Sequence, residues 1–329
     1  MLDNHKRNIN YLRVSVTDRC NLRCVYCMPK EGLSQLGHRD ILSYEEILRV
    51  VEVAIKTGIA KVRVTGGEPL VRRGIVEFMA LLKDMEGLRD ISMTTNGILL
   101  EKYAKDLYES GIKRINVSLD SLDSEKYRKI TRQGELSRVL QGIAKAEHIG
   151  FSPIKINVVA IDGFNDDEIV DFAKLTMTKP YQVRFIEYMP IGPASLENGF
   201  RSLSNDVIMD RINHVIPIEP LGENGGTDGP ARLYKMRGAV GTIGFISAIS
   251  HQFCQSCNRL RLTADGKLRA CLLIDNEVDV RSPLRNGCTD LELEEIIKYV
   301  IINKPLHGGI RCHKNQRKNC TRTMSSIGG

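Results

Sequence analysis

YLRVSVTDRCNLRCVYC, residues 11–27, joins a short strand pattern to a loop that carries three cysteines. Apolar residues at every second position of its first half are typical of a strand with one buried face. Cys20, Cys24 and Cys27 then follow with the spacing C-x3-C-x2-C. Three thiolates can hold three irons of a [4Fe–4S] cluster and leave the fourth iron open for a small molecule. A zinc site or unrelated cysteines are the alternatives, although structural zinc prefers four protein ligands.

Similar strand patterns recur along roughly the first 190 residues, and a helical pattern follows each of them. The predicted strands are Tyr11–Val16, Lys61–Thr65, Ile91–Thr95, Arg114–Leu119, Ile154–Val159 and Val183–Glu187. A capping box of Ser43 and Glu46 predicts a helix after the first strand, which Gly58 can end. Asn165 and Glu168 predict a similar helix start after the fifth strand. This β-α alternation predicts a parallel sheet, arranged either as a doubly wound sheet or as an incomplete (β/α) barrel.

The pattern changes after Met189, where Pro190 and Pro193 interrupt it. Residues 222–230 hold four glycines and are typical of a loop or linker. Beyond them we predict two antiparallel strands and a helix: Leu233–Arg237, Thr242–Ile246 and Leu291–Ile302. We therefore expect two domains, residues 1–221 and residues 222–329, with the second packed on the first.

A second cysteine set lies in this C-terminal region. Cys254 and Cys257 form a C-x2-C pair, and Cys271 follows after 13 further residues. A zinc ribbon would normally add a second C-x2-C pair, whereas only one cysteine follows here. The set therefore fits either a second iron–sulfur site with an open position or a zinc site. Three cysteines lie outside both sets: Cys288, Cys312 and Cys320. Cys312 and Cys320 could form a third metal site with His313.

The composition, with 42% hydrophobic and 26% charged residues, is typical of a soluble globular protein. No apolar run approaches the ~20 residues that span a bilayer, and residues 1–7 lack the apolar core of a signal peptide. We therefore expect a cytoplasmic protein without a membrane partner, whose clustered cysteines bind metals rather than form disulfides. The net charge is +7, and residues 308–329 contain no acid. This basic tail is either a solvated end or a contact for a polyanion.

Cations occupy the polar positions of several predicted strands. In a barrel, alternate residues of a strand face the helices and the lumen. The cations that would face the lumen are Arg13, Arg63, Lys155 and Arg184. Buried unpaired cations are costly, so they imply an anion between them, and arginine forks match phosphate oxygens well. The opposite assignment would bury these cations beneath the helices.

The C-x3-C-x2-C loop after the first strand resembles the hallmark of the radical S-adenosylmethionine (SAM) superfamily. Gly66-Gly67-Glu68-Pro69 follows the second strand, where this superfamily holds the methionine part of SAM, although alone it would be taken for a simple turn. The resemblance implies an incomplete (β/α)6 TIM-type barrel rather than a doubly wound sheet, with a C-terminal α+β region closing its open side. It also implies that SAM binds the open iron and yields a 5′-deoxyadenosyl radical.

Asn258-Arg259-Leu260-Arg261-Leu262, directly after the C-x2-C pair, is similar to the GTP 3′,8-cyclase family of molybdenum cofactor synthesis. Residues 12–20 and the pair Gly328-Gly329 resemble that family as well, so the resemblance covers nearly the whole chain. It implies conversion of GTP to (8S)-3′,8-cyclo-7,8-dihydroguanosine 5′-triphosphate with SAM and a reductant. It further implies a second [4Fe–4S] cluster on Cys254, Cys257 and Cys271 that binds the guanine base.

The resemblance assigns three groups of site residues. Those expected to contact SAM are Tyr26, Gly67, Ser118 and Met189. Those expected to contact GTP are Arg13, Arg63, Thr94, Lys155, Arg184, Arg259, Leu260 and Arg261. Those expected to act in catalysis are Cys20, Cys24, Cys27, Arg259, Arg261, Gly328 and Gly329, the last two because the double-glycine segment of the family enters the active site.

The resemblance also implies partners. The product would pass to cyclic pyranopterin monophosphate synthase, and an electron donor would reduce the first cluster. No nucleic acid is expected as a partner, and the sequence leaves a homodimer open. Two rival functions stay open. One is a radical SAM enzyme that modifies RNA or a peptide with an auxiliary cluster, and the other is a zinc protein that binds nucleic acid through the basic tail.

Overall fold

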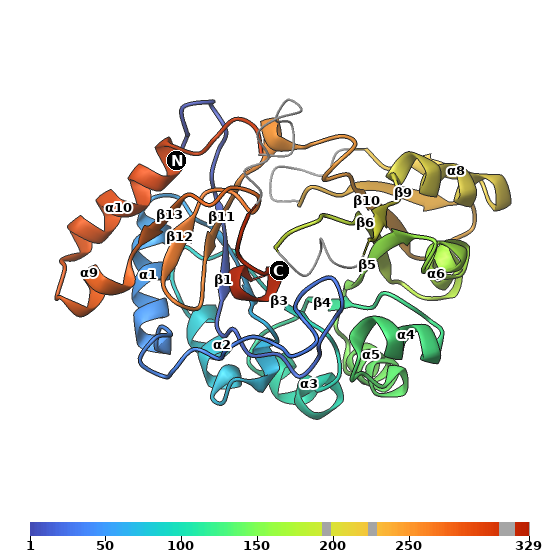
Figure 1. Ribbon diagram of the computed structural model, residues 1–329, viewed down its shortest axis with the longest axis horizontal. Helices are drawn as coiled ribbons and strands as arrows, with labels where there is room; N and C mark the ends of the chain where they lie inside the picture. Colours follow the sequence, from blue (N-terminus) through green and yellow to red (C-terminus); the bar gives the residue numbers. More distant parts are fainter. Residues whose placement is uncertain (193–198, 223–228, 309–319, 329) are drawn as a thin grey trace.

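The computed structural model describes residues 1–192, 199–222, 229–308 and 320–328. Its first part is an arc of parallel strands with helices along the outer side (Figure 1). The strands are β1 Tyr11–Ser15, β2 Lys61–Thr65, β3 Asp90–Thr95, β4 Ile115–Ser118, β5 Ile154–Asp162 and β6 Gln182–Glu187. The helices are α1 Tyr44–Lys56, α2 Ile75–Lys83, α3 Leu100–Glu109, α4 Ser124–Thr131, α5 Leu136–Ile149 and α6 Ile169–Thr178.

The later part of the chain adds strands, two longer helices and short 3-10 turns. The strands are β7 Arg201–Ser202, β8 Ile218–Pro220, β9 Arg232–Met236, β10 Thr242–Ile246, β11 Arg259–Leu262, β12 Lys267–Arg269 and β13 Glu277–Asp279. The helices are α8 Asn205–Val215, α9 Arg281–Arg285 and α10 Asp290–Ile302, with turns η3 Cys254–Ser256 and η4 Met324–Ile327. The predicted antiparallel pair is confirmed as β9 and β10, and the predicted last helix as α10.

The six predicted strands of the first part are confirmed, with ends that differ by at most three residues. In the sheet they follow one another in chain order, from β1 to β6. A doubly wound sheet would reverse its strand order part-way, at the point where ligands usually bind. The uninterrupted order therefore confirms the partial barrel.

Two strands of the later part extend this arc at its two edges. β11 pairs in parallel with β1, and β10 pairs in parallel with β6. Beyond them the pairing becomes antiparallel and, in the described residues, ends at β13 on one side and β8 on the other. The sequence predicted β10 only as part of a hairpin and did not predict β11. The later region thus supplies barrel strands as well as covering elements.

Helix α1 begins as the sequence predicts. The Ser43 hydroxyl accepts from the backbone N–H of Glu46 at 3.1 Å, and the Glu46 carboxylate accepts from the backbone N–H of Ser43 at 2.7 Å. Gly58 follows the helix with a φ of 101°, a left-handed conformation that favours glycine. The apolar side of α1 is fully buried, and it belongs to the same hydrophobic core as the apolar residues of β1 and β2.

The predicted cap at Asn165 is wrong in its mechanism. A 3-10 turn follows Asn165 and α6 begins at Ile169, but the Asn165 side chain caps neither. Its amide instead donates to the backbone carbonyl of Asp120 at 2.7 Å, and the Glu168 carboxylate accepts from the Ser121 hydroxyl at 2.9 Å. Both side chains are buried. They tie the loop after β4 to the end of β5, because unpaired polar groups would be costly there.

The alternation of apolar and polar residues is clear in β5. Ile154, Ile156 and Val158 are buried in the core between strands and helices. Lys155 and Asn157 lie on the opposite face and are only half-buried. The predicted division of each strand into a helix-facing side and a lumen-facing side is therefore confirmed here.

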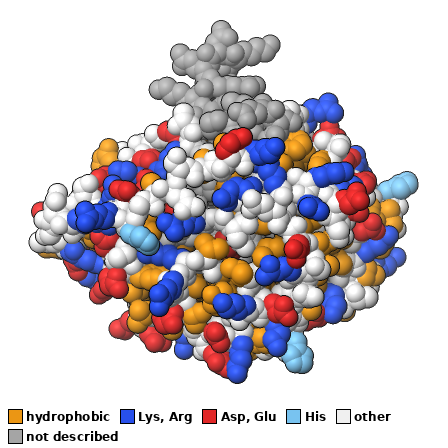
Figure 2. All heavy atoms as spheres, turned by 60° about the horizontal axis from the view of Figure 1, so that its bottom comes forward, with side chains coloured by type: hydrophobic (Ala, Val, Ile, Leu, Met, Phe, Trp, Pro, Cys, Tyr) orange, Lys and Arg blue, Asp and Glu red, His pale blue; other side chains and the backbone are white. Residues whose placement is uncertain are grey.

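The outer surface carries charges of both signs. Figure 2 shows Lys and Arg side chains interspersed with Asp and Glu side chains over one face of the molecule. In the described part of the chain, every helix is too short or too polar to cross a lipid bilayer.

Candidate functional site

Strand register places three arginines side by side on the lumen face. Arg13 on β1 lies opposite Arg261 on β11 and opposite Arg63 on β2. The next position in the row is Ser92 on β3, whose hydroxyl accepts from Arg63 Nε at 3.1 Å. Burial, with repulsion from Arg63 adding to it, lowers the pKa of Arg13 to about 10. A row of neighbouring cations inside a protein is stabilised by a bound anion.

Two more cations lie across the arc on β5 and β6. Lys155 and Arg184 line a hollow of about 200 Å³ together with Arg114 and Gln182. Burial is the main cause that lowers the pKa of Lys155 to about 6, and Arg184 and Arg63 lower it further. Without an anion this lysine therefore loses its proton near neutral pH.

Several polar atoms of the lumen have no hydrogen-bond partner among the described residues. They are Tyr11 Oη, Thr94 Oγ1 and Asn157 Oδ1, all three fully buried as atoms. Most buried polar atoms in proteins are hydrogen-bonded. Together with the cations, these atoms give the lumen the donor and acceptor groups that suit a polar, anionic ligand.

Backbone hydrogen bonds hold the first cysteine loop against helix α4. Its backbone pairs with the end of α4 through Arg23 N–H to Thr131 O, at 3.0 Å, and Val25 N–H to Ile130 O, at 2.9 Å. Burial raises the pKa of Cys20 to about 11 and that of Cys27 to about 12. These thiols therefore need the charge of a metal to become thiolates.

The Gly66–Pro69 segment links this loop to β2 and β3. Gly67 lies so close to Arg19 that a Cβ atom would overlap the Arg19 carbonyl oxygen, so only glycine fits. The Glu68 carboxylate accepts from Thr95 Oγ1 at 2.7 Å and from Asn96 N–H at 2.6 Å, and burial raises its pKa to about 7. The segment is more than a simple turn, because it holds the cysteine loop against the strand ends.

The other residues expected to contact SAM lie around the same loop. Tyr26 donates from its hydroxyl to Asp120 at 2.6 Å, and Asp120 follows Ser118 at the end of β4. Burial raises the pKa of Asp120 to about 6. Met189 packs with Met324 of the tail in a small apolar cluster. Tyr26 thus lies within the first cysteine set, whereas Gly67 and Ser118 lie at the carboxyl ends of β2 and β4.

The second cysteine set is assembled around Gly308. A Cβ atom at Gly308 would lie 3.6 Å from the sulfur of Cys271 and 3.8 Å from that of Cys254, and the Gly308 N–H donates to Cys254 Sγ at 3.3 Å. In the described residues, no three Cys, His, Asp or Glu side chains converge as ligands of one ion do. Each cysteine of a cubane cluster binds its own iron, so the ligands of a cluster lie further apart than those of a single ion.

Cations surround this second set. Burial alone would raise the pKa of Cys257, but Arg259 and Lys304 lower it to about 6. Lys304 is buried and donates to the backbone carbonyls of Arg259, at 2.8 Å, and Ala270. Arg7 donates to the carbonyl of Cys254 at 2.7 Å. The thiolate form that metals require is therefore favoured at Cys257.

The end of the described chain enters the lumen. The Gly328 carbonyl accepts from Thr65 Oγ1 at 3.0 Å, from Arg261 Nη1 at 3.1 Å and from Arg13 Nη2 at 3.4 Å. Gly328 has a φ of 74°, and a Cβ there would lie 2.9 Å from Ser15 Cβ. Gly328 is thus no solvated end, and it requires glycine. Gly329 lies outside the described residues.

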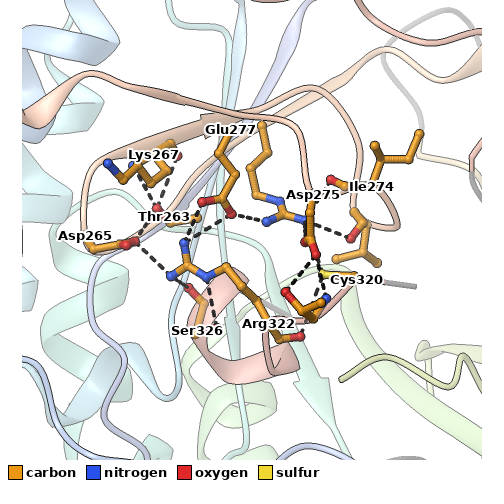
Figure 3. Close-up of polar contacts among 12 residues, drawn as sticks. Thr263, Asp265, Lys267, Ile274, Asp275, Glu277, Cys320, Arg322 and Ser326 are labelled. Carbon is orange, nitrogen blue, oxygen red and sulfur yellow. Dashed lines mark hydrogen bonds and ion pairs between the residues drawn. The ribbon is translucent and has the colours of Figure 1, made fainter. Parts of the chain in front are cut away.

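Ion pairs anchor this tail outside the lumen (Figure 3). Arg322 contacts Asp265 at 3.0 Å and Glu277 at 3.1 Å, and it also donates to the hydroxyl and carbonyl oxygens of Ser326 in η4. The Asp275 carboxylate accepts from Thr321 Oγ1 at 2.8 Å. The turn that delivers Gly328 to the arginine row is therefore held by charged side chains of the β12–β13 region.

Leu260 is buried in the apolar core on the side of β11 opposite Arg261, so its side chain is turned away from the lumen. Its assignment as a substrate contact stays a prediction that concerns its backbone. Cys320 is buried and accepts from Arg269 at 3.3 Å, whereas Cys312 and His313 lie outside the described residues.

Sequence reasoning missed several groups that shape the site: Asp120, Lys304, Arg322 and the carboxylate of Glu68. A polar residue just after a strand end was the available signal for Asp120. No local sequence pattern indicated the role of Arg322, because its partner carboxylates are 45 and 57 residues away in the chain.

Comparison with known proteins agrees with this geometry. Residues 14–176 match the radical SAM superfamily, and residues 181–309 match the family described as Molybdenum Cofactor Synthesis C. The chain is 48% identical over 329 residues to the GTP 3′,8-cyclase of Alkaliphilus oremlandii, and 50% identical over 337 residues to that of Thermodesulfovibrio yellowstonii. Each alignment covers 100% of both chains. The chain belongs to the GTP 3′,8-cyclase family.

Both family resemblances read from the sequence are thereby confirmed. The fold is also similar to that of Streptococcus suis SuiB bound to S-adenosylmethionine, with a TM-score of 0.59 and 17% sequence identity. That likeness covers 93% of this chain and 68% of SuiB. As a radical SAM enzyme of this family, the chain requires a [4Fe–4S] cluster and SAM, and Cys20, Cys24 and Cys27 provide a donor set that fits the cluster.

The low pKa of Lys155 leads to a test with GTP. At about pH 8 this lysine is neutral in the free protein, and a bound triphosphate raises its pKa, so binding takes up about one proton. Affinity for GTP should accordingly fall as the pH rises above about 6. Calorimetric titration in buffers of different ionisation enthalpy measures the proton. Lys155→Met should abolish the uptake and the exposed control Lys113→Met should keep it; unchanged uptake in Lys155→Met would contradict the assignment.

Proposed function

We propose that this chain converts GTP to (8S)-3′,8-cyclo-7,8-dihydroguanosine 5′-triphosphate, the first step of molybdenum cofactor synthesis. Family membership supports the reaction. The observation that carries it is the row of Arg261, Arg13 and Arg63 on the lumen face, facing Lys155 and Arg184. Such a lumen suits the triphosphate of a nucleotide.

The first cysteine set holds the cluster that reacts with SAM. Cys20, Cys24 and Cys27 bind three irons, and Tyr26 and Gly67 border the SAM site together with Ser118 and Met189. When bound, the cluster and SAM supply an electron and a 5′-deoxyadenosyl radical for hydrogen abstraction from the ribose. The chain itself needs no general base for that step; it has to orient two substrates and exclude water.

GTP lies between the two cysteine sets. Its triphosphate contacts the cations of the lumen, and Thr94 adds a hydroxyl. Arg259 and Arg261 sit at the β11 edge beside the second cysteine set, where positive charge stabilises charge that develops on the substrate. Cys254, Cys257 and Cys271 would hold a second [4Fe–4S] cluster, which would offer an open coordination position to the guanine base.

The wider assignments belong to this proposal as well. Residues 1–221 form the radical SAM barrel domain, and residues 222–329 form the region with the second cluster and the double-glycine segment. The product passes to cyclic pyranopterin monophosphate synthase. A separate reductant supplies the electron.

The activity is tested by anaerobic incubation of the reconstituted protein with GTP, SAM and dithionite. We expect the cyclised nucleotide and 5′-deoxyadenosine, identified by mass spectrometry and NMR. Cys24→Ser should form neither product, because the electron reaches SAM through the first cluster. SAM cleavage without any GTP-derived product, but with a modified RNA or peptide, would favour the rival radical SAM function instead.

The second cluster is tested by iron and sulfide analysis. The wild-type protein should hold about eight irons per chain, and a Cys254→Ser/Cys257→Ser variant about four. Cys288→Ser, outside both sets, is the matched control and should keep all of them. If the wild-type protein instead holds only about four irons together with zinc, the second set is a zinc site.

The tail is tested by removing its anchor. Arg322→Ala should lower kcat roughly 100-fold while GTP affinity changes little, because a misplaced Gly328 disturbs orientation more than binding. Gly328→Ala should do the same, since a Cβ would meet Ser15 and force the tail out of the lumen. Arg281→Ala, on α9, is the control. Loss of GTP affinity equal to the loss of kcat would contradict a positioning role.

A further inference from the structure

A surface hollow of about 680 Å³ lies outside the lumen, next to the first cysteine loop. Five cations and one acid line it: Arg23, Lys30, Arg128, Lys129, Arg132 and Glu125. Among the described residues, none of the five cations forms an ion pair with a carboxylate; Arg23 and Arg132 donate to backbone carbonyls instead. The lining of the hollow thus carries a clear excess of positive charge, which Glu125 offsets only in part.

The loop between the first two cysteines contributes Arg23 to the lining of the hollow. Arg23 lies between Cys20 and Cys24 in the chain and donates to the Cys20 carbonyl at 2.7 Å. Arg132 donates to the carbonyl of Arg23 at 3.1 Å and to that of Met28 at 2.9 Å. Two cations of the hollow are therefore hydrogen-bonded directly to the backbone that carries the cluster ligands.

Helix α4 connects the two sides in another way. Tyr127 is buried and lies near enough to Cys24 and Cys20 for their charges to act on it. The next two residues, Arg128 and Lys129, are exposed and line the hollow. In α4, Tyr127 thus points to the first cysteine set, whereas Arg128 and Lys129 point to the solvent.

We propose that this hollow is the docking surface for a small acidic electron-transfer protein that reduces the first cluster. The step moves one electron from the reduced carrier to the oxidised cluster, so the carrier leaves oxidised by one electron and no group is transferred. Complementary charge steers such encounters and gives them a strong salt dependence. A nucleic acid fits less well, because the described residues of the lining include no aromatic side chain on which a base could stack.

The proposal rests on the first cluster alone, and its test needs no GTP. Reduction of the reconstituted cluster is followed anaerobically by stopped-flow absorbance near ~400 nm. The electron source is either reduced flavodoxin, an acidic carrier, or dithionite. Because cluster reduction is measured directly, the outcome does not depend on whether the protein cyclises GTP.

The test variant is Arg128→Glu/Lys129→Glu. It should slow reduction by flavodoxin at least about tenfold at low salt and remove most of the salt dependence, while dithionite reduces the cluster at the wild-type rate. Binding of oxidised flavodoxin, measured by calorimetry, should weaken in parallel. The control Lys102→Glu/Lys105→Glu makes the same charge change at exposed positions of α3 and should behave as wild type.

Three outcomes would overturn the proposal. The first is equal reduction by flavodoxin in the test variant and the wild type. The second is an equal loss with flavodoxin and dithionite, which would mean that α4 only supports the cysteine loop. The third is loss of RNA oligonucleotide binding with unchanged reduction by flavodoxin, which would assign the hollow to a nucleic acid.

Discussion

Repulsion between like charges on neighbouring strands is the constraint on which the site depends. Parallel pairing keeps equivalent positions of adjacent strands on one face, so Arg261, Arg13 and Arg63 form a continuous row. The Gly328 carbonyl meets two of these arginines. A peptide carbonyl is only a dipole and cannot neutralise the full charges of the three arginines. The lumen therefore binds a polyanion more favourably than a neutral ligand. Ligand preference is thus set mainly by strand register, with loops adding the cofactor-binding residues.

The two cysteine sets differ in how their immediate neighbours act on the thiols. Burial raises the pKa of Cys20 and Cys27; Glu68 raises that of Cys20 further, and Asp120 raises that of Cys27. At the second set, Arg259 and Lys304 lower the pKa of Cys257 to about 6. The thiolate is therefore favoured by the protein alone at Cys257, whereas at Cys20 and Cys27 it depends on a bound metal.

Local patterns predicted most of the fold and part of the site. Strict alternation revealed the first six strands and the inward cations, because each strand carries helices on one side only. Strand β11 was missed, since Arg259–Leu262 is only four residues long and its partner β1 lies at the other end of the chain. The core-facing side chain of Leu260 was not anticipated, because family resemblance was applied to the whole Arg-Leu-Arg segment, whereas alternation would have turned this side chain to the core. The Asn165 cap failed because buried tertiary hydrogen bonds outweighed a local preference.

The pairing of β1 with β11 also governs the order in which the protein can be assembled. The first cysteine set is contained within eight consecutive residues, so its ligands are close together even in an unfolded chain. The second set lies among contacts that join residues up to 247 positions apart, with Arg7 on the Cys254 carbonyl and Gly308 beside Cys254 and Cys271. Closing such long loops is the slow part of folding. The surroundings of the second set are therefore complete only after both ends of the chain have met, whereas the first set is local from the start.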